Sequence, residues 1–213
     1  MKNWIPYLLF SLLIAGCSGE KSTFSIPAPP PASATESTVT LPKPHEILPA
    51  SQSFYRQAVL AYGKGNHTDA LQLANRALEQ DKENYQALSL KGIILAFDRS
   101  PEEGIPYIEK SLTIAPGYTQ AFYDMAMVQK LGGHPDISNA YFEKVVHSDP
   151  QNVWSYYGMA TNWADMGNKD RSLLYLEKAV VLGGADVKAA AERQDHFSRF
   201  RDDPDFQKIL AKK

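Results

Sequence analysis

The feature that most constrains this chain is a period of 34 residues. Residues 51–186 divide without insertion into four consecutive blocks of that length, 51–84, 85–118, 119–152 and 153–186. The fourth residue of each block is large: Phe54, Leu88, Phe122 and Tyr156. The eighth and twentieth residues are small: Ala58, Gly92, Ala126 and Ala160, then Ala70, Gly104, Ser138 and Ser172. This spacing predicts an array of stacked structural repeats.

Each block is expected to form two helices joined by a short turn. Small residues at the eighth and twentieth positions allow the paired helices to approach closely, and large residues fill the groove between them. Gly65, Gly133 and Gly167 fall where the first helix ends, which suits a left-handed cap. Pro116 and Pro150 are expected to stop the second helix before the next block begins.

The pattern resembles the tetratricopeptide repeat family. The fourth block is most similar, with Tyr156, Met159, Ala160, Trp163, Gly167, Ser172, Leu176 and Ala179 at the positions that define the family motif. The resemblance implies an all-α fold, a right-handed superhelical solenoid of antiparallel helix pairs. It implies four tetratricopeptide units over residues 51–186.

Some positions depart from the family pattern. The first block has Gln57, Ala61 and Ala74 where larger apolar side chains are usual, so it is expected to pack loosely. The second block has Arg99 in place of the turn glycine. Pro106 lies inside its second helix and is expected to kink that helix or delay its start.

Residues 187–213 are expected to close the array. The start of this segment has a helical pattern, and Phe197, Phe200 and Phe206 follow. A solenoid must cover its last apolar face, so we assign this segment as a C-terminal cap.

Residues 1–16 have the pattern of a secretory signal peptide. Its apolar run is shorter than the roughly 20 residues that a membrane-spanning helix needs. The sequence Ile14-Ala15-Gly16-Cys17 resembles the bacterial lipobox. That resemblance implies that Cys17 carries acyl chains such as palmitate and becomes the first residue of the mature lipoprotein. An ordinary signal peptide that happens to contain a cysteine is the alternative.

The lipobox resemblance also implies a place in the cell envelope. Ser18 follows the cysteine where an aspartate would favour retention at the inner membrane. In a Gram-negative cell we therefore expect a lipid anchor in the outer membrane, with the protein facing the periplasm. In a Gram-positive cell the anchor would lie in the outer face of the cytoplasmic membrane.

Residues 17–50 are rich in proline, serine and threonine and have no hydrophobic period. Such a segment buries too little apolar surface to offset its ordering entropy, so we expect an unstructured tether. A spacer between membrane and array is the favoured interpretation, and a proline-rich recognition motif is the alternative.

Composition argues against several other functions. The formal charge of -2 gives no electrostatic argument for nucleic-acid binding. The five histidines have no metal-binding spacing, and no phosphate-binding loop or nucleophile motif occurs. We therefore expect no catalytic residues, no metal and no cofactor.

In the tetratricopeptide family, the second, fifth, ninth and twelfth residues of each repeat line a concave face. Here these positions are rich in aromatic and amide side chains and carry little charge. The resemblance implies a groove for an extended or helical peptide, with candidate contacts at Tyr55, Tyr62, Tyr123, Met127, Trp154 and Tyr157. The alternative is that several of these aromatic side chains belong to the core or pack against the tether or the cap.

Some family members clamp a partner's C-terminal carboxylate with lysine, asparagine and arginine side chains. The corresponding positions here are Tyr55, Val59, Leu90, Gln120 and Asp124, so the clamp is absent.

The leading hypothesis is an envelope adaptor or scaffold that docks protein partners into a larger assembly, such as pilus, secretion or cell-wall machinery. Two alternatives remain open. The array could self-associate into a structural homo-oligomer, or it could bind a small envelope ligand such as a glycan.

Overall fold

The computed structural model describes residues 43–212 of the chain. The expected signal peptide, the lipid attachment site at Cys17 and most of the expected tether lie outside the described residues. No helix within the described range combines the length and apolar composition that a bilayer crossing requires.

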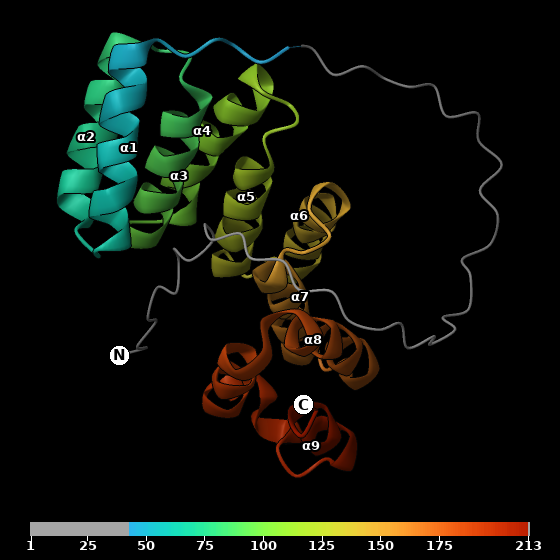
Figure 1. The fold of residues 1–213 in the computed structure, drawn as a ribbon. Coiled ribbons are helices and arrows are strands. Elements are labelled where there is room, and N and C mark those ends of the chain that lie inside the picture. The colour runs from blue at the N-terminus through green and yellow to red at the C-terminus, as the bar shows by residue number, and fades with distance from the viewer. Residues whose placement is uncertain (1–42, 213) are drawn as a thin grey trace, which may run out of the picture. The chain divides into compact units, whose positions relative to one another are not determined.

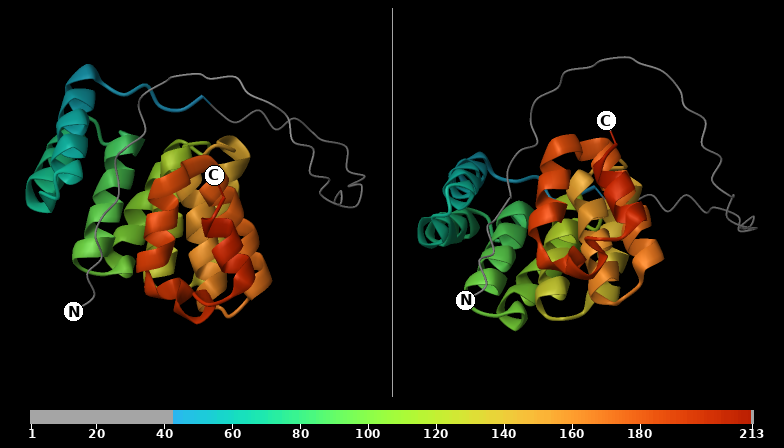
Figure 2. Two further views of the ribbon diagram at one scale, coloured as in Figure 1. Left: turned by 60° about the horizontal axis from the view of Figure 1, so that its bottom comes forward. Right: turned by 90° about the horizontal axis from the view of Figure 1, so that it is seen from below.

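The described chain is helical, and its first eight helices form four consecutive pairs (Figures 1 and 2). The pairs are α1 (Pro49–Gly63) with α2 (His67–Gln80), α3 (Tyr85–Asp98) with α4 (Pro101–Ile114), α5 (Thr119–Leu131) with α6 (Pro135–Ser148), and α7 (Val153–Asp165) with α8 (Lys169–Arg193). Each second helix begins 34 residues after the previous one. Each pair also packs against the next, which confirms the expected all-α solenoid of helix pairs.

Short polar caps and glycines define the turns between helices. Gly65, Gly133 and Gly167 have φ angles of 76°, 79° and 78°, the left-handed conformation expected for them. The side chains of Asn66, Asn84, Asn152 and Asn168 accept hydrogen bonds from backbone amides at the starts of α2, α3, α7 and α8. These caps satisfy amides that have no partner inside the helix.

Close packing of paired helices depends on small residues at the predicted positions. A Cβ atom added at Gly104 would clash with the carbonyl oxygen of Gly92 and with Cβ of Ala96. The backbones of α3 and α4 therefore approach to a distance that only glycine permits. The large side chain of Ile108 is fully buried at the same junction.

The prediction that Pro106 delays the start of its helix is wrong. Helix α4 begins at Pro101 and continues through Pro106. Proline at this position removes one hydrogen bond to the carbonyl of Glu102, in the first turn of the helix. Glu102 is exposed, so water can satisfy that carbonyl and the helix tolerates the loss.

The end of the expected tether is ordered over residues 43–50. His45 Nε2 lies 3.0 Å from the Asp81 carboxylate, and the backbone amide of Leu48 donates to the same group at 3.0 Å. Asp81 is the C-cap of α2. These contacts fasten the chain to the first helix pair just before α1 begins, which composition alone did not indicate.

The C-terminal segment packs against the last helix pair (Figure 2). Gly184, with φ 54° and ψ −131°, breaks α8 and redirects the chain. The 3₁₀ helix η1 (Asp195–Phe200) and helix α9 (Pro204–Leu210) follow. Their side chains Phe197, Phe200, Phe206 and Ile209 join the buried cluster of α7 and α8.

Candidate functional site

The first helices of successive pairs lie side by side: α1 contacts α3, α3 contacts α5, and α5 contacts α7. We call the second, fifth, ninth and twelfth residues of the four blocks, all on these helices, the first-helix stripe. Side-chain hydrogen bonds cross between neighbouring helices. Ser89 Oγ donates to Asp124 Oδ2 at 2.6 Å, and Lys130 Nζ donates to Thr161 Oγ1 at 2.5 Å. Side chains therefore link α3 to α5 and α5 to α7 along the first helices.

Tyrosines gather at the N-terminal half of the stripe. Tyr55 and Tyr62 come from α1, Tyr123 from α5, and Tyr118 from the loop that precedes α5. The hydroxyl groups of Tyr55 and Tyr118 lie 3.5 Å apart. We call these four residues the tyrosine cluster. The ring of Tyr85 packs edge-to-face on Tyr118, with 5.0 Å between centroids.

Asp124 follows Tyr123 on α5, and its carboxylate acts electrostatically on all four phenols of the cluster. Its side chain is only 3% exposed. Besides the bond from Ser89, it accepts one hydrogen bond at 2.8 Å, from Gln120 Nε2 to Oδ1. Within residues 43–212, no lysine, arginine or histidine pairs with it. Burial raises the pKa of Asp124 to about 7, although the two hydrogen bonds oppose that shift.

Burial also affects the phenol groups of the tyrosine cluster. It raises the pKa of each member of the tyrosine cluster, and the Asp124 carboxylate raises it further. A negative charge disfavours a second negative charge nearby. All four hydroxyls therefore lie within electrostatic reach of one buried carboxylate and stay protonated at neutral pH.

A second polar network joins α5, α7 and η1. Lys130 Nζ donates to Thr161 Oγ1 and to Asn162 Oδ1 at 2.9 Å, and it lies 3.8 Å from Asp165 Oδ2. Asp165 Oδ1 in turn pairs with His196 Nδ1 at 2.6 Å. Burial lowers the pKa of Lys130 to about 8, and Asp165 opposes the shift. The amine has three acceptors around it, so we assign Lys130 a structural role.

Trp154 and Tyr157 form a pair at the C-terminal half of the stripe. Their rings meet edge-to-face with 5.7 Å between centroids. The ring of Tyr157 also packs on the ring of Phe197 in η1, with 6.0 Å between centroids. Tyr157 is 6% exposed, and its hydroxyl has no hydrogen-bond partner within the described chain. For Tyr157, the alternative of packing against the C-terminal segment therefore holds. Trp154 remains partly exposed.

Tyr123 and Met127 are partly buried against the core cluster of Ala126, Phe142 and Met159. Asp124 thus acts electrostatically on Tyr55, Tyr62 and Tyr123. Met127 packs on the same core cluster as Tyr123, and Trp154 packs against Tyr157. Whether these side chains contact a partner stays a prediction.

Sequence reasoning missed Tyr118 and the burial of Asp124. Tyr118 is the last residue of its block and lies outside the positions that the family pattern assigns to the groove. In the sequence, Asp124 stands at a position where the carboxylate clamp would need a basic or amide residue. The available signal was an acidic residue inside an otherwise largely apolar helix, α5.

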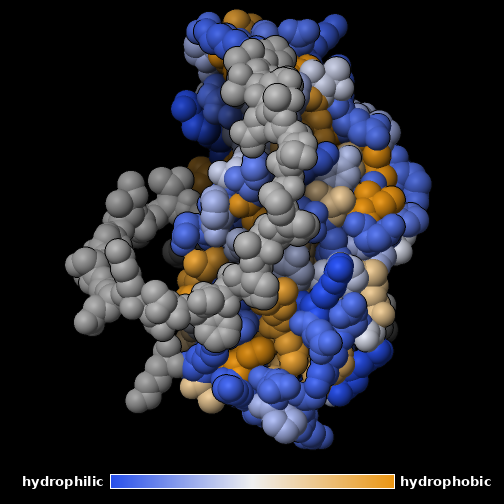
Figure 3. All heavy atoms as spheres, turned by 90° about the vertical axis from the view of Figure 1, so that its right-hand side faces the viewer, coloured by the Kyte–Doolittle hydropathy of each residue, from blue (hydrophilic) through white to orange (hydrophobic). Residues whose placement is uncertain are grey.

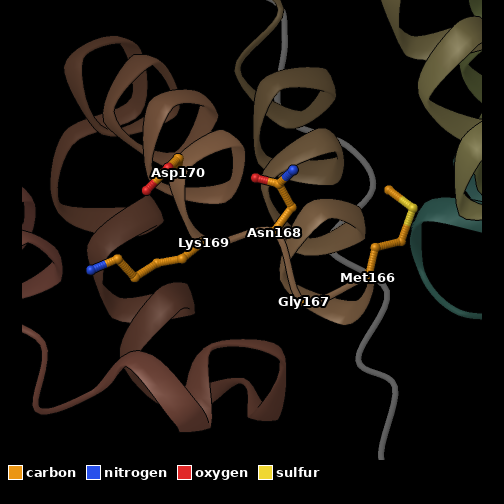
Figure 4. Close-up of a pocket in the computed structure, with 5 residues that line it drawn as sticks. All are labelled: Met166, Gly167, Asn168, Lys169 and Asp170. Atoms are coloured by element: carbon orange, nitrogen blue, oxygen red, sulfur yellow. The ribbon is translucent and has the colours of Figure 1, made fainter.

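Other surface features of residues 43–212 do not indicate a ligand. The turn between α7 and α8 forms an open hollow lined by Met166, Gly167, Asn168, Lys169 and Asp170 (Figure 4). Asn168 caps α8, and Lys169 pairs with Asp203 at 2.6 Å, so both side chains already have partners.

Within the described part of the chain, no group of three or more histidine, cysteine or acidic side chains could hold a metal. On the face in Figure 3, apolar residues reach the surface between polar ones.

Comparison with known proteins identifies the fold. No protein-family model and no curated protein matches the sequence. Among solved structures, the tetratricopeptide protein TTC0263 of Thermus thermophilus is 16% identical with a TM-score of 0.63, covering 76% of this chain and 86% of that one. PilF of Pseudomonas aeruginosa is 13% identical with a TM-score of 0.63, covering 75% and 73%. YrrB, described as a tetratricopeptide protein with an unusual peptide-binding site, is 20% identical with a TM-score of 0.55, covering 68% and 75%.

Proposed function

We propose that this chain, which has the tetratricopeptide fold, is a lipid-anchored envelope protein that binds a segment of a protein partner along the first-helix stripe. In this role it acts as an adaptor or assembly factor for an envelope complex, with pilus, secretion and cell-wall machinery as candidates. The observation that carries the proposal is the run of partly exposed aromatic and amide side chains on consecutive first helices.

The chemistry of the stripe supports a peptide ligand. Tyr55, Tyr123 and Trp154 each keep part of their surface exposed while the rest is fixed by neighbouring side chains. Aromatic side chains held in this way lose little conformational entropy on binding and supply large contact areas, as in binding hot spots. Gln52, Gln86 and Gln120 recur at the second position of three blocks and can bond to a peptide backbone.

The proposed location rests on the N-terminal sequence. A short apolar run followed by Ile14-Ala15-Gly16-Cys17 supports lipidation at Cys17. Stable attachment by lipid requires more than one acyl chain, which a bacterial lipoprotein cysteine carries. The proline-rich residues up to 42 would then separate the array from the membrane.

Capture of partners from detergent-solubilised membranes tests the binding proposal. The full-length protein is compared with a Tyr123→Ala/Trp154→Ala double variant. A matched control, Leu174→Ala/Val181→Ala, removes two apolar side chains from α8 that are 51% and 69% exposed. We expect the stripe variant to lose partners that the control retains, while circular dichroism shows both folded. Equal recovery by the stripe variant would exclude the stripe as the binding surface.

Metabolic labelling with palmitate tests the anchor. We expect the wild-type protein to incorporate label and the Cys17→Ser variant to lose it and leave the membrane fraction. Labelled Cys17→Ser protein would contradict lipidation at this residue.

A further inference from the structure

The buried charge of Asp124 has no structural explanation within the described fold. Its two hydrogen bonds come from neutral donors, Ser89 and Gln120. An asparagine could join α3 to α5 through the same two residues. Burying a carboxylate without a cation is far less favourable than burying an amide. The fold therefore needs a polar side chain at this position and gains nothing from its negative charge.

Among residues 43–212, Asp124 has neutral partners and no paired cation. The carboxylate acts electrostatically on four tyrosine side chains, of which Tyr55 and Tyr118 bring their hydroxyls within 3.5 Å of each other. The faces of aromatic rings attract cations. Within residues 43–212, the hydroxyls of Tyr62 and Tyr123 have no hydrogen-bond partner, and neither is among the fully buried unpaired polar atoms.

A second acceptor points to the same chemistry. Gln86 Oε1 is buried and has no donor among the described residues. Gln86 precedes Ser89 by three residues on α3, so the two side chains lie on one face of the helix. A ligand with several N–H donors and a positive charge would satisfy both Gln86 and Asp124.

The two carboxylate oxygens of Asp124 differ in how accessible their hydrogen-bond partners are to a ligand. Oδ2 is held by the fully buried Ser89, whereas the partner of Oδ1 is Gln120, whose side chain is exposed. Displacement of the Gln120 amide would free Oδ1 for a ligand that enters from the stripe.

We propose that the tyrosine cluster and Asp124 form a recognition site for an arginine side chain of the partner segment. This rests on the proposed function, because it places the arginine on a peptide bound along the first-helix stripe. A guanidinium group fits better than an ammonium group for two reasons. It is planar, so it stacks on tyrosine rings, and it is weakly hydrated, so it loses less on burial. Its five N–H donors can serve Asp124 and Gln86 together.

Binding of small probes tests the site without knowledge of the partner. The full-length protein, with ¹³C-labelled tyrosine, is titrated in detergent with Nα-acetylarginine amide. Nα-acetylcitrulline amide, the neutral analogue of the same shape, is the control ligand. We expect the arginine probe to shift the signals of Tyr55, Tyr62 and Tyr123 and to bind at least tenfold more tightly than the citrulline probe. Equal binding of the two probes would overturn the proposal.

Variants locate the charge that is responsible. Asp124→Asn should reduce binding of the arginine probe to the level of the citrulline probe. Asp165→Asn, which removes the carboxylate that pairs with Lys130 and His196, should leave it unchanged. Retention of arginine binding by a folded Asp124→Asn protein would refute the assignment.

The capture experiment separates this proposal from the proposed function. If Tyr123→Ala/Trp154→Ala loses the partner and Asp124→Asn keeps it, the arginine site is wrong and the stripe proposal stands. If the stripe variant keeps the partner, the proposed function is wrong, whatever the small probes show. Loss of the partner by both variants supports both proposals.

Discussion

Replacement of Asp124 by asparagine measures how strongly the fold disfavours a negative charge at this buried position. In the unfolded chain the carboxyl ionises near its ordinary pKa of 3.8, whereas burial raises the pKa in the folded protein to about 7. Between these two values the folded state binds more protons than the unfolded state. The free energy of unfolding therefore falls as the pH rises from about 4 to about 7, and it does not change further above that range on account of Asp124.

The size of the effect follows from the two pKa values. A separation of about three pH units, at roughly 1.4 kcal/mol per unit, amounts to about 4 kcal/mol. The asparagine side chain would carry no charge at any pH and could keep bonds to Ser89 and Gln120 if the Gln120 amide turns over. Asp124→Asn should therefore match the wild type near pH 4 and exceed its stability by up to about 4 kcal/mol at pH 8.

Thermal unfolding followed by circular dichroism at a series of pH values provides the assay. For a chain of this size, about 4 kcal/mol corresponds to a difference in Tm of roughly 10 °C at pH 8. All other titratable groups are common to both proteins, so their effect cancels in the difference. Asp165→Asn is the control. Burial alone would raise the pKa of Asp165, but the hydrogen bond and charge of His196 outweigh burial and lower that pKa. Asp165→Asn should therefore show no such rise in stability between pH 5 and 8. A constant difference between wild type and Asp124→Asn across this range would refute the reasoning.

Three further substitutions test the packing of the array by unfolding measurements. Gly104→Leu should overpack α3 against α4 and lower stability by about 1–3 kcal/mol; an unchanged Tm would mean that these helices are not in close contact. Gly133→Ala places a Cβ at φ 79° and should cost about 1–2 kcal/mol although nothing lies within 4 Å of it, so a neutral result in urea unfolding would exclude the left-handed turn. Phe197→Ala should lower stability by about 3–5 kcal/mol and speed amide exchange in α9, because its ring is fully buried between α7 and α9; slow exchange in α9 would show that the segment folds independently.

The paired-helix fold could be predicted because its determinants are local and recur. Gly65, Gly133 and Gly167 end the first helices in left-handed turns, as the spacing indicated. Gly92 and Gly104 allow the close approach of α3 and α4 because they have no side chain, which residue type alone reveals. Each of these residues acts within its own block, so a repeated pattern was enough to find it.

The environment of Asp124 could not be predicted in the same way. Ser89 from the preceding block donates a hydrogen bond to it, and its carboxylate raises the pKa of Tyr55, two blocks away, and of Tyr118 in an inter-helix loop. A period identifies equivalent positions, and it does not show which side chains from different blocks meet. The same limit applies to Tyr157, whose burial depends on Phe197 beyond the last block.

Local context also decided two smaller outcomes. Pro106 is tolerated because the carbonyl that loses its partner belongs to an exposed residue. Residues 43–48 are ordered because His45 and the amide of Leu48 both bind Asp81 at the end of α2. Composition marked this segment as unstructured because neither contact is visible in a proline-rich sequence.

Site-specific photo-crosslinking in living cells tests partner binding by the stripe most directly. Benzoylphenylalanine is introduced in turn at the positions of Tyr55 and Trp154 on the stripe and of Leu174 on α8, which is 51% exposed. Binding along the stripe predicts that the Tyr55 and Trp154 positions yield the same crosslinked partner and that the Leu174 position does not. A partner captured only from Leu174, or from none of the stripe positions, would contradict binding on the first helices.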